Sequence, residues 1–337
     1  MKKITVYCEV NHLNKKIADV SYELITKAYE LTKKAFSLTN EEYIVEAVGL
    51  SDEIEDDSIK KTFAAGATNF VFVKNDCLSK FSQTVFAQCF VEYYIQSRPE
   101  IIIFPATPVG RIVAPRITTM LNTGLVADCT DLDFVVRENK MYFAPTRPTF
   151  GSELMATILS KTLPQCATVR EKTFKAEFDK NIEGALCEFY PNSYEENRIK
   201  LVRSIFDKEC SANDFSNAKI VFVAGYGLAD HRDKKYFLRL EEIAKIIGAK
   251  VGSTRKIVDL GIMGHEYQIG QTGSTVEADL YIAFGVSGAI QHVAGMKNCK
   301  TIVAINTDEN AEIFNYADYK IVADAKMIID ELLEKLR

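Results

Sequence analysis

The polar, glycine-rich segment Gly285 to Met296 (GVSGAIQHVAGM) carries the side chains best suited to ligand chemistry in this sequence. It follows the apolar run Leu280 to Phe284, which predicts a buried strand. In open α/β sheets, ligands bind beyond the carboxyl ends of the strands. Gly285 and Gly288 would let a ligand approach the backbone closely, and Ser287 offers a hydroxyl to a phosphate. We therefore expect a ligand at this strand end.

His292 lies in the same segment and is one of only four histidines in the chain. A structural histidine with paired ring nitrogens is the more common case, but a position at a strand end favours a ligand contact. Two later predicted strands also end in polar side chains, Asn306 and Asp324. With Ser287, they predict one extended, nucleotide-like ligand lying across the edge of the sheet.

Two further glycine-containing segments could approach such a ligand. Gly225 to Asp230 (GYGLAD) follows a predicted strand, where backbone N–H groups can contact a pyrophosphate, although a tight turn explains it equally well. No acidic residue follows at the ribose-binding position of a nicotinamide site, about 20 residues on, which disfavours an NAD dehydrogenase. Gln268 to Ser274 (QIGQTGS) can present donors to a flat polar ring or form a surface turn.

Metal, nucleic-acid and membrane functions are disfavoured by composition. The eight cysteines form no C-x-x-C pair and have no histidine at zinc spacing, so we expect reduced thiols without zinc or an iron–sulfur cluster. The net charge is −5 with scattered Lys and Arg, which argues against a nucleic-acid partner. The chain shows neither the apolar region of a signal peptide nor an apolar run of about 20 residues, so we expect a cytoplasmic protein without membrane insertion.

The elements that must position these residues alternate between strands and helices. Apolar residues recur every three or four positions from Leu13 to Ala35, which predicts an amphipathic helix. Strands alternating with helices predict an α/β fold whose sheets are mostly parallel and flanked by helices. The strands predicted in the first half are Ile4 to Val10, Tyr43 to Val48, Phe70 to Val73 and Ile101 to Phe104.

The chain is long enough for two domains. Short β-rich runs from Asp131 to Phe206 predict an antiparallel extension of the first sheet. The polar stretch Lys208 to Asn217 predicts the boundary, giving domains 1–207 and 208–337, the second of them Rossmann-like. Its predicted elements are strands at Lys219 to Val223, Leu280 to Phe284, Thr301 to Asn306 and Ile321-Val322, with helices at Tyr236 to Ile247 and Ala325 to Leu336.

Together these segments resemble the alpha subunit of electron-transfer flavoproteins. Leu280 to Asp324 looks like the family's FAD-binding signature almost throughout. Upstream, Val251 to Arg255 (VGSTR) matches a V-G-x-S/T-R element, and QIGQTG matches a Q-x-G-Q-T-G loop. The first half shares Gly110-Arg111 with Ala114-Pro115-Arg116, TGLVADCT from Thr123, and RPTFGSELMATI from Arg147.

The resemblance implies that the second domain binds FAD. Arg255 would lie beside the isoalloxazine, Thr272 and Gln271 would contact its N5/O4 side, and His292 would lie at the N1/O2 edge, where cations stabilise reduced flavin. Gly285, Ser287 and neighbouring amides would hold the diphosphate, with Asn306 and Asp324 toward the adenosine end. No catalytic residue and no metal ligand is implied. The cofactor-binding residues implied are Gly225, Tyr226, Gly227, Thr254, Arg255, Gln268, Gln271, Thr272, Gly273, Gly285, Ser287, Gly288, Ala289, Gln291, His292, Asn306 and Asp324.

Two positions depart from the family's pattern. Tyr226 stands where the glycine-rich turn usually carries Arg, so the cationic contact expected there would be lost or supplied by Arg232. Ala278 replaces a Pro usual before the next strand, a position that tolerates many residue types.

The resemblance implies an electron carrier that works as a heterodimer with a smaller beta subunit. Its redox partners would be flavin dehydrogenases, such as acyl-CoA dehydrogenases. The beta subunit would hold either AMP in a simple shuttle or a second flavin in a system that bifurcates electrons from NADH, and the sequence leaves both open. The alternative is a stand-alone flavin- or nicotinamide-dependent oxidoreductase, which would need a positioned acid, base or nucleophile. A third reading, an adenine-nucleotide-binding regulator, ranks last because no phosphate loop follows Ile4 to Val10.

Overall fold

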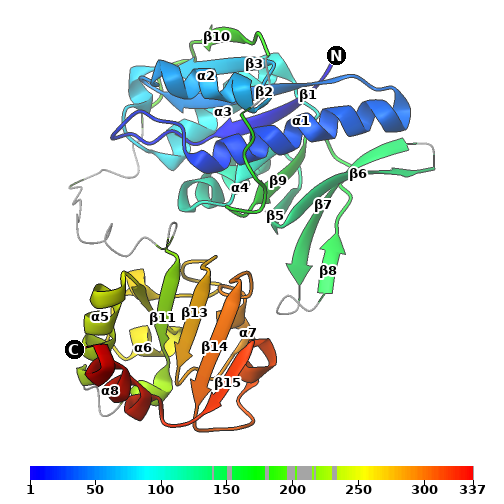
Figure 1. Cartoon of the computed structure of the whole chain (residues 1–337). Helices are drawn as coiled ribbons and strands as arrows, with labels where there is room; N and C mark the ends of the chain where they lie inside the picture. Colours follow the sequence, from blue (N-terminus) through cyan, green and yellow to red (C-terminus); the bar gives the residue numbers. More distant parts are fainter. Residues whose placement is uncertain are drawn as a thin grey trace. The chain divides into compact units, whose positions relative to one another are not determined.

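The computed structural model divides the chain into two compact units, Met1–Val202 and Arg203–Arg337 (Figure 1). The structure describes residues 1–138, 140–149, 154–178, 182–195, 202, 215, 218–229 and 234–336. The predicted boundary segment 208–217 lies outside the described residues except for Phe215. Each unit has its own sheet and its own buried apolar residues, so each is described by itself.

The first unit is built on a seven-stranded parallel sheet in the order β10-β3-β2-β1-β4-β9-β5. Its helices cover both faces: α1 and α2 pack on one apolar core, while α3 and α4 pack on the other. The strands are β1 (Lys2–Cys8), β2 (Tyr43–Ser51), β3 (Asn69–Lys74), β4 (Ile101–Pro105), β5 (Leu125–Cys129), β9 (Gln165–Val169) and β10 (Ala185–Phe189), and the helices are α1 (Asp19–Thr39), α2 (Asp56–Ala65), η1 (Asp76–Leu78), α3 (Gln83–Ser97) and α4 (Pro108–Met120).

The antiparallel part of this unit differs from the sequence-based expectation. Strands β6 (Asp131–Arg137), β7 (Lys140–Thr149) and β8 (Leu154–Thr157) form a separate three-stranded antiparallel sheet, so they do not extend the first sheet. Strand β9, expected in the same extension, instead pairs in parallel between β4 and β5. Four of its five residues are buried, as suits the interior of a parallel sheet.

The second unit is a five-stranded parallel sheet in the order β12-β11-β13-β14-β15. Helices α5 and α8 pack on one face of this sheet, and α7 and η6 pack on the other. The strands are β11 (Ile220–Ala224), β12 (Lys250–Ser253), β13 (Leu280–Phe284), β14 (Thr301–Asn306) and β15 (Tyr319–Val322), and the helices are η4 (Tyr226–Leu228), α5 (Lys235–Ile247), α6 (Arg255–Asp259), η5 (His265–Tyr267), α7 (Ile290–Val293), η6 (Glu312–Tyr316) and α8 (Ala325–Leu336).

The pairing register of this sheet brings its strand ends to one edge. Ala224, the last residue of β11, pairs with Ser253 of β12 and with Phe284 of β13, so these three strands end level with one another. After β11 the chain forms β12 on one side of β11 and then β13 on its other side. This order makes the gap between β11 and β13 the topological switch point, where open α/β sheets bind ligands.

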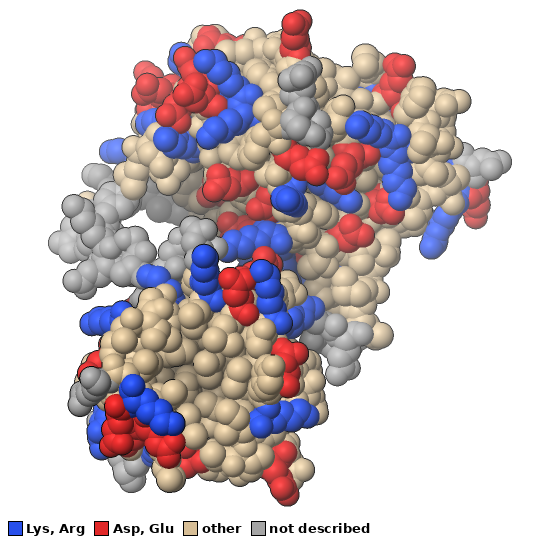
Figure 2. Space-filling model, viewed as in Figure 1, with Lys and Arg blue, Asp and Glu red and all other residues tan. Residues whose placement is uncertain are grey.

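Charged side chains of both signs lie close together on the face of each unit that Figure 2 shows.

Among the described helices, none combines the length and the apolar character that crossing a membrane requires.

Candidate functional site

The loops that leave β11 and β13 are fastened to each other at the switch point. The N–H of Gly225 donates to the carbonyl of Phe284 at 2.8 Å, and the N–H of Gly227 donates to the carbonyl of Gly285 at 3.0 Å. These two donors are therefore occupied, and the expected donation of their N–H groups to a pyrophosphate does not fit this arrangement. Their role in the structure is to lock the two loops together.

The loop after β13 needs glycine at two positions. Gly285 has φ 64° and Gly288 has φ 93°, a region that L side chains rarely adopt. A Cβ atom on Gly288 would also lie 2.0 Å from the backbone nitrogen of Ile313. The loop can therefore follow this path only because Gly288 has no side chain. Helix η6 packs directly against the loop at this residue.

The same loop presents unused backbone donors. The N–H of Ile313 donates to the Ser287 carbonyl at 3.0 Å, and Asn306 Nδ2 donates to the Val286 carbonyl at 2.8 Å. These two hydrogen bonds tie the carbonyl groups of the loop to η6 and to the end of β14. Within the described part of the chain, the N–H groups of Ser287, Gly288 and Ala289 have no acceptor. Consecutive free amides in a curved loop form a concave anion-binding surface.

The loop Gln268 to Ser274 lies beside the loop after β13. The N–H of Gln271 donates to the Gln291 carbonyl at 2.7 Å, and the N–H of Ile269 donates to the Ser253 carbonyl at 3.0 Å. Buried Gln268 donates through Nε2 to the Thr272 hydroxyl at 2.8 Å. Thus Gln271 and Thr272 remain exposed while their backbone is tied to two neighbouring segments.

His292 holds these segments together from inside. It is only 7% exposed; Nδ1 lies 2.9 Å from the Ile269 carbonyl and Nε2 lies 2.7 Å from the Tyr281 hydroxyl. Because a carbonyl only accepts, Nδ1 carries the proton, and the Tyr281 hydroxyl donates to Nε2. Burial lowers the pKa of His292 to about 4, partly opposed by the hydrogen bond to Ile269.

The expectation of a cationic His292 is therefore wrong: at neutral pH its imidazole is uncharged. Both of its nitrogens are already paired within the protein. Its contact with a ligand stays a prediction. The sequence could not reveal its partners, because the Tyr281 hydroxyl and the Ile269 carbonyl come from two other segments of the chain.

Two cations lie at the carboxyl end of β12. The side chain of Arg255 is 69% exposed, with Nε 3.5 Å from Asp259 Oδ2. Next to it, the Lys256 ammonium lies 3.7 Å from the centre of the Tyr226 ring. Lys256 was missed by the sequence analysis, although its place beside Arg255 could have indicated it. Arg232, the expected substitute, lies outside the described residues.

The other predicted residues at this edge serve mainly as supports. Thr254 donates its N–H to the Ala224 carbonyl at 3.1 Å. Asn306 uses Oδ1 to accept the N–H of Asp308 at 3.0 Å, and Asp324 uses Oδ1 to accept the N–H of Lys326 at 2.8 Å in the first turn of α8. These contacts leave the adenosine-binding roles of Asn306 and Asp324 as predictions. Gly273 contributes its N–H to the carbonyl of Gly270 at 3.0 Å.

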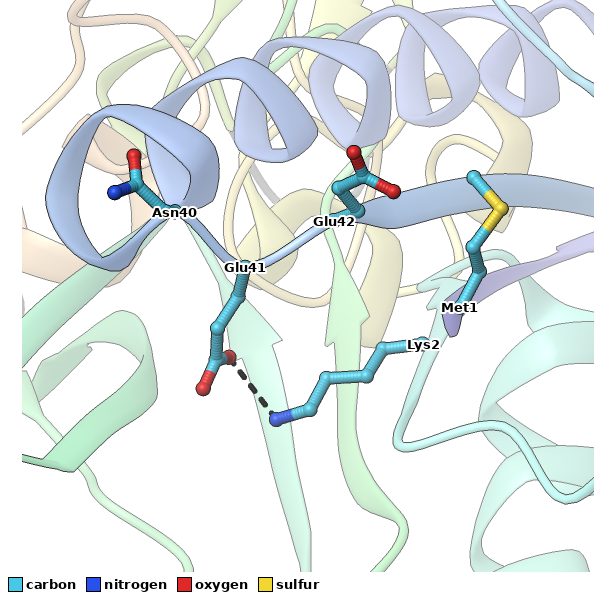
Figure 3. A pocket seen from close by; sticks show the side chains of 5 residues that line it. All are labelled: Met1, Lys2, Asn40, Glu41 and Glu42. Atoms are coloured by element: carbon cyan, nitrogen blue, oxygen red, sulfur yellow. Dashed lines mark hydrogen bonds and ion pairs between the residues drawn. The ribbon is translucent and has the colours of Figure 1, made fainter.

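A separate hollow in the first unit does not share this chemistry. Figure 3 shows it lined by Met1, Lys2, Asn40, Glu41 and Glu42, with Lys2 paired to Glu41 at 3.0 Å. It lies at the amino ends of β1 and β2, opposite the edge where parallel sheets bind ligands. We therefore place the candidate site in the second unit.

Comparison with known sequences agrees with this placement. A family model described as the electron transfer flavoprotein domain matches residues 6–187, more than half of the chain. A second one, described as the electron transfer flavoprotein FAD-binding domain, matches residues 214–297. The chain belongs to the electron transfer flavoprotein alpha-subunit family. The second match contains the loops after β11, β12 and β13, so the family's flavin-binding region coincides with the fastened loops.

Two alpha subunits of this flavoprotein family align along nearly the whole chain, and a further relative aligns along most of it. The electron transfer flavoprotein subunit alpha of Thermoanaerobacterium thermosaccharolyticum is 36% identical, covering 100% of this chain and 98% of that protein. The subunit alpha of Megasphaera elsdenii is 31% identical, covering 98% and 96%. Protein FixB of Clostridium saccharobutylicum is 37% identical, covering 83% of each. Among solved structures, Acinetobacter baumannii MurG aligns with a TM-score of 0.30 and 10% identity over 100% of this chain and 91% of that one.

The site of this flavoprotein fits a flavin nucleotide on its own chemistry. The free amides of Ser287, Gly288 and Ala289 suit a diphosphate. This concave row of amides, here called the cradle, can form only because Gly288 lacks a Cβ. The buried Ser253 hydroxyl, without a partner among the described residues, lies at the same strand edge. Exposed Gln271, Thr272 and Arg255 supply polar groups for a ring.

Replacing Gly288 tests the cradle. Gly288→Ala should cost about 1–2 kcal/mol for its positive φ, plus a steric cost where Cβ meets the Ile313 nitrogen, and should abolish flavin retention. The control is Gly261→Ala, which has φ 68° but no atom within 4 Å of its Cβ. Urea unfolding and the bound-flavin content of both variants measure the difference. Equal losses in the two variants would mean that the cradle makes no steric demand.

Acid should weaken the second unit through His292. Its folded pKa of about 4 lies below the unfolded value of 6.5, so its stabilising contribution is complete above pH 6.5 and is lost as pH falls toward 4. The difference in unfolding free energy between wild type and His292→Gln should shrink by about 3 kcal/mol over that window. Urea titrations at several pH values measure it, with exposed His265→Gln as control. A difference that stays constant with pH would contradict the buried, neutral state of His292.

Proposed function

We propose that this chain is the flavin-carrying alpha subunit of a heterodimeric electron-transfer flavoprotein, and that FAD is the flavin it binds. The observation that carries the proposal is the row of free amides on the two-glycine loop after β13, at the switch point of a parallel sheet. The family match over the same segment supports it. When bound, FAD would supply the redox chemistry, taking up and passing on electrons.

The residues of the site would divide the work of binding. The amides of Ser287, Gly288 and Ala289 would hold the diphosphate by charge-assisted hydrogen bonds. Gln268 Nε2 donates to the Thr272 hydroxyl oxygen, which leaves the hydroxyl's own hydrogen free to donate to the ring. His292 would keep the loop carrying Gln271 and Thr272 at a fixed distance from the loop after β13.

Arg255 would set the electrostatic potential at the site. A positive charge near a group that becomes more negative on reduction stabilises the reduced form and raises the midpoint potential. With His292 neutral, this task falls to the cations at the end of β12. Each 1.4 kcal/mol of differential stabilisation corresponds to roughly 60 mV for a one-electron step.

This arrangement suits an electron carrier better than a stand-alone oxidoreductase. Substrate conversion needs an acid, base or nucleophile with a reactive atom turned toward the substrate. His292, the best candidate for a general base, has both nitrogens engaged within the protein. Purified protein with absorption bands near 375 and 450 nm (about the free-flavin positions) would support the proposal, and a colourless chain that does not take up added FAD would refute it.

Neutralising Arg255 should lower the midpoint potential while FAD stays bound. For Arg255→Gln we expect a fall of about 60 mV, the equivalent of about 1.4 kcal/mol. Potentiometric titration of the flavin measures it. The control is Lys245→Gln in the last turn of α5, which precedes the amino end of β12, whereas Arg255 follows the carboxyl end of that strand. An unchanged potential in Arg255→Gln, or an equal fall in Lys245→Gln, would count against the role of Arg255.

The first unit would provide assembly with the beta subunit. Leu154 and Met155 of β8 are 59% and 56% exposed, and Leu163 farther along the chain is 61% exposed. Contiguous exposed apolar surface marks interaction sites, and permanent heterodimers usually bury more than about 2,000 Å², so we assign the adjacent Leu154 and Met155 to such a surface. The beta subunit would complete the particle, and flavin dehydrogenases such as acyl-CoA dehydrogenases would be its redox partners.

We also infer that the protein works in the cytoplasm. All seven described cysteines are free thiols, and five of them are buried. Free thiols are typical of reducing compartments.

Charges on β8 should disrupt this assembly. Leu154→Lys with Met155→Lys should reduce co-purification with a co-expressed beta subunit at least about tenfold, because two apolar contacts are replaced by buried charges. The control is Leu238→Lys on α5, which likewise places a lysine at an exposed leucine, since Leu238 is 61% exposed. Analytical ultracentrifugation of the co-expressed pairs measures the heterodimer. A full yield of heterodimer with both lysines in β8 would show that this sheet is not the interface.

A further inference from the structure

The ring of Tyr226 is held in a fixed place at the switch point. Its neighbours Gly225 and Gly227 both donate their N–H groups to the loop after β13, at 2.8 and 3.0 Å. The turn can therefore move little relative to Gly285. Yet Tyr226 itself is 51% exposed, and no hydrogen bond to its hydroxyl is found among the described residues. An exposed aromatic ring on a fixed turn needs an explanation other than core packing.

Lys256 supplies the partner of this ring. β11 and β12 end level, with Ala224 paired to Ser253, so the residues just beyond both strands meet at the same edge. The Lys256 ammonium lies 3.7 Å from the centre of the Tyr226 ring. Its neighbour Arg255 has a carboxylate, Asp259, at 3.5 Å. Among the described residues, no carboxylate lies within ion-pair distance of Lys256, so its charge is not neutralised within this part of the chain.

We propose that Tyr226 and Lys256 form a composite anion-binding group, in which the ring positions the ammonium and the ammonium binds a phosphate oxygen of the dinucleotide. The proposal rests on the proposed function and names a further residue of the same site. Lys256 then acts as a ligand contact, and Tyr226 acts as the residue that positions it.

The position of the pair favours a diphosphate as the anion. The turn that carries Tyr226 is bonded directly to Gly285, and the free amides of Ser287, Gly288 and Ala289 follow on that same loop. An ammonium on one side and a row of N–H groups on the other suit a group with several anionic oxygens. An ammonium on a ring face keeps N–H donors that point away from the ring, because the interaction with the ring is electrostatic and needs no single hydrogen bond.

The pair also differs from an ordinary lysine on a surface. A free lysine side chain loses considerable rotamer freedom when it binds an anion. Contact with the ring restricts the Lys256 side chain before the ligand arrives, so less freedom is lost on binding. This predicts that the two residues depend on each other: removing the ring matters only while the ammonium is present.

A double-mutant cycle on the full chain tests the proposal, with FAD and ADP as separate probes measured by calorimetry. Lys256→Ala should weaken both by about tenfold, the usual contribution of one hydrogen bond to a charged group. Tyr226→Leu should weaken both by about threefold, and Tyr226→Phe, which keeps the ring, should restore most of that loss. Riboflavin, which lacks phosphate, should bind all variants alike.

The double variant Tyr226→Leu with Lys256→Ala should bind no more weakly than Lys256→Ala alone. Strictly additive losses would overturn the positioning role of the ring, and unchanged FAD and ADP affinity in Lys256→Ala would overturn the contact itself. Neither outcome would contradict the proposed function as long as the wild-type chain binds FAD. Wild-type chain that binds neither FAD nor ADP would refute both proposals together.

Discussion

The candidate site depends on the parallel, in-register pairing of β11 with β13. Because Ala224 and Phe284 are paired, the turn after one strand and the loop after the other begin at the same level. The carbonyls of Phe284 and Gly285 then lie within reach of the N–H groups of Gly225 and Gly227. A slip of one residue in this pairing would turn every side chain of β13 to the opposite face and separate the two loops. The sheet thus sets the positions of the loops, and the loops set the positions of the protein groups that would bind a ligand.

A second layer of contacts turns this frame into a site of defined shape. The segments 253–255, 268–274 and 285–295 are joined by hydrogen bonds between backbone groups and by His292. Among the described residues of these segments, the unused groups include the free amides on the loop after β13 and the buried Ser253 hydroxyl at the end of β12. This division follows from the cost of leaving a buried polar group unpaired, which is high where water cannot reach. The amides without an acceptor are left where a ligand can reach them.

Much of the second unit could be predicted from the sequence because its central strands are nearly continuous apolar runs. Leu280 to Phe284 and Thr301 to Asn306 have the predicted bounds. Strand β12 was not predicted, since Lys250 to Ser253 is short and contains a glycine. The contact between Lys256 and Tyr226 could not be predicted either: it joins residues thirty positions apart whose proximity is set by strand order. The buried, neutral state of His292 depends in the same way on partners from two other segments.

The order of strands in the first unit determines when this part of the chain can fold. β9 separates β4 from β5, although β5 is synthesised before it, and β10 pairs with β3 at the far edge, where Ala185 lies opposite Asn69. A nascent chain that ends within the antiparallel strands β6 to β8 therefore lacks the strand that joins β5 to the sheet. Such pairings between distant segments slow folding, because a long loop must close before they form. Strands β1 to β4 can pair with one another as they are made, but the sheet of the first unit becomes complete on the ribosome only after residue 189 has emerged.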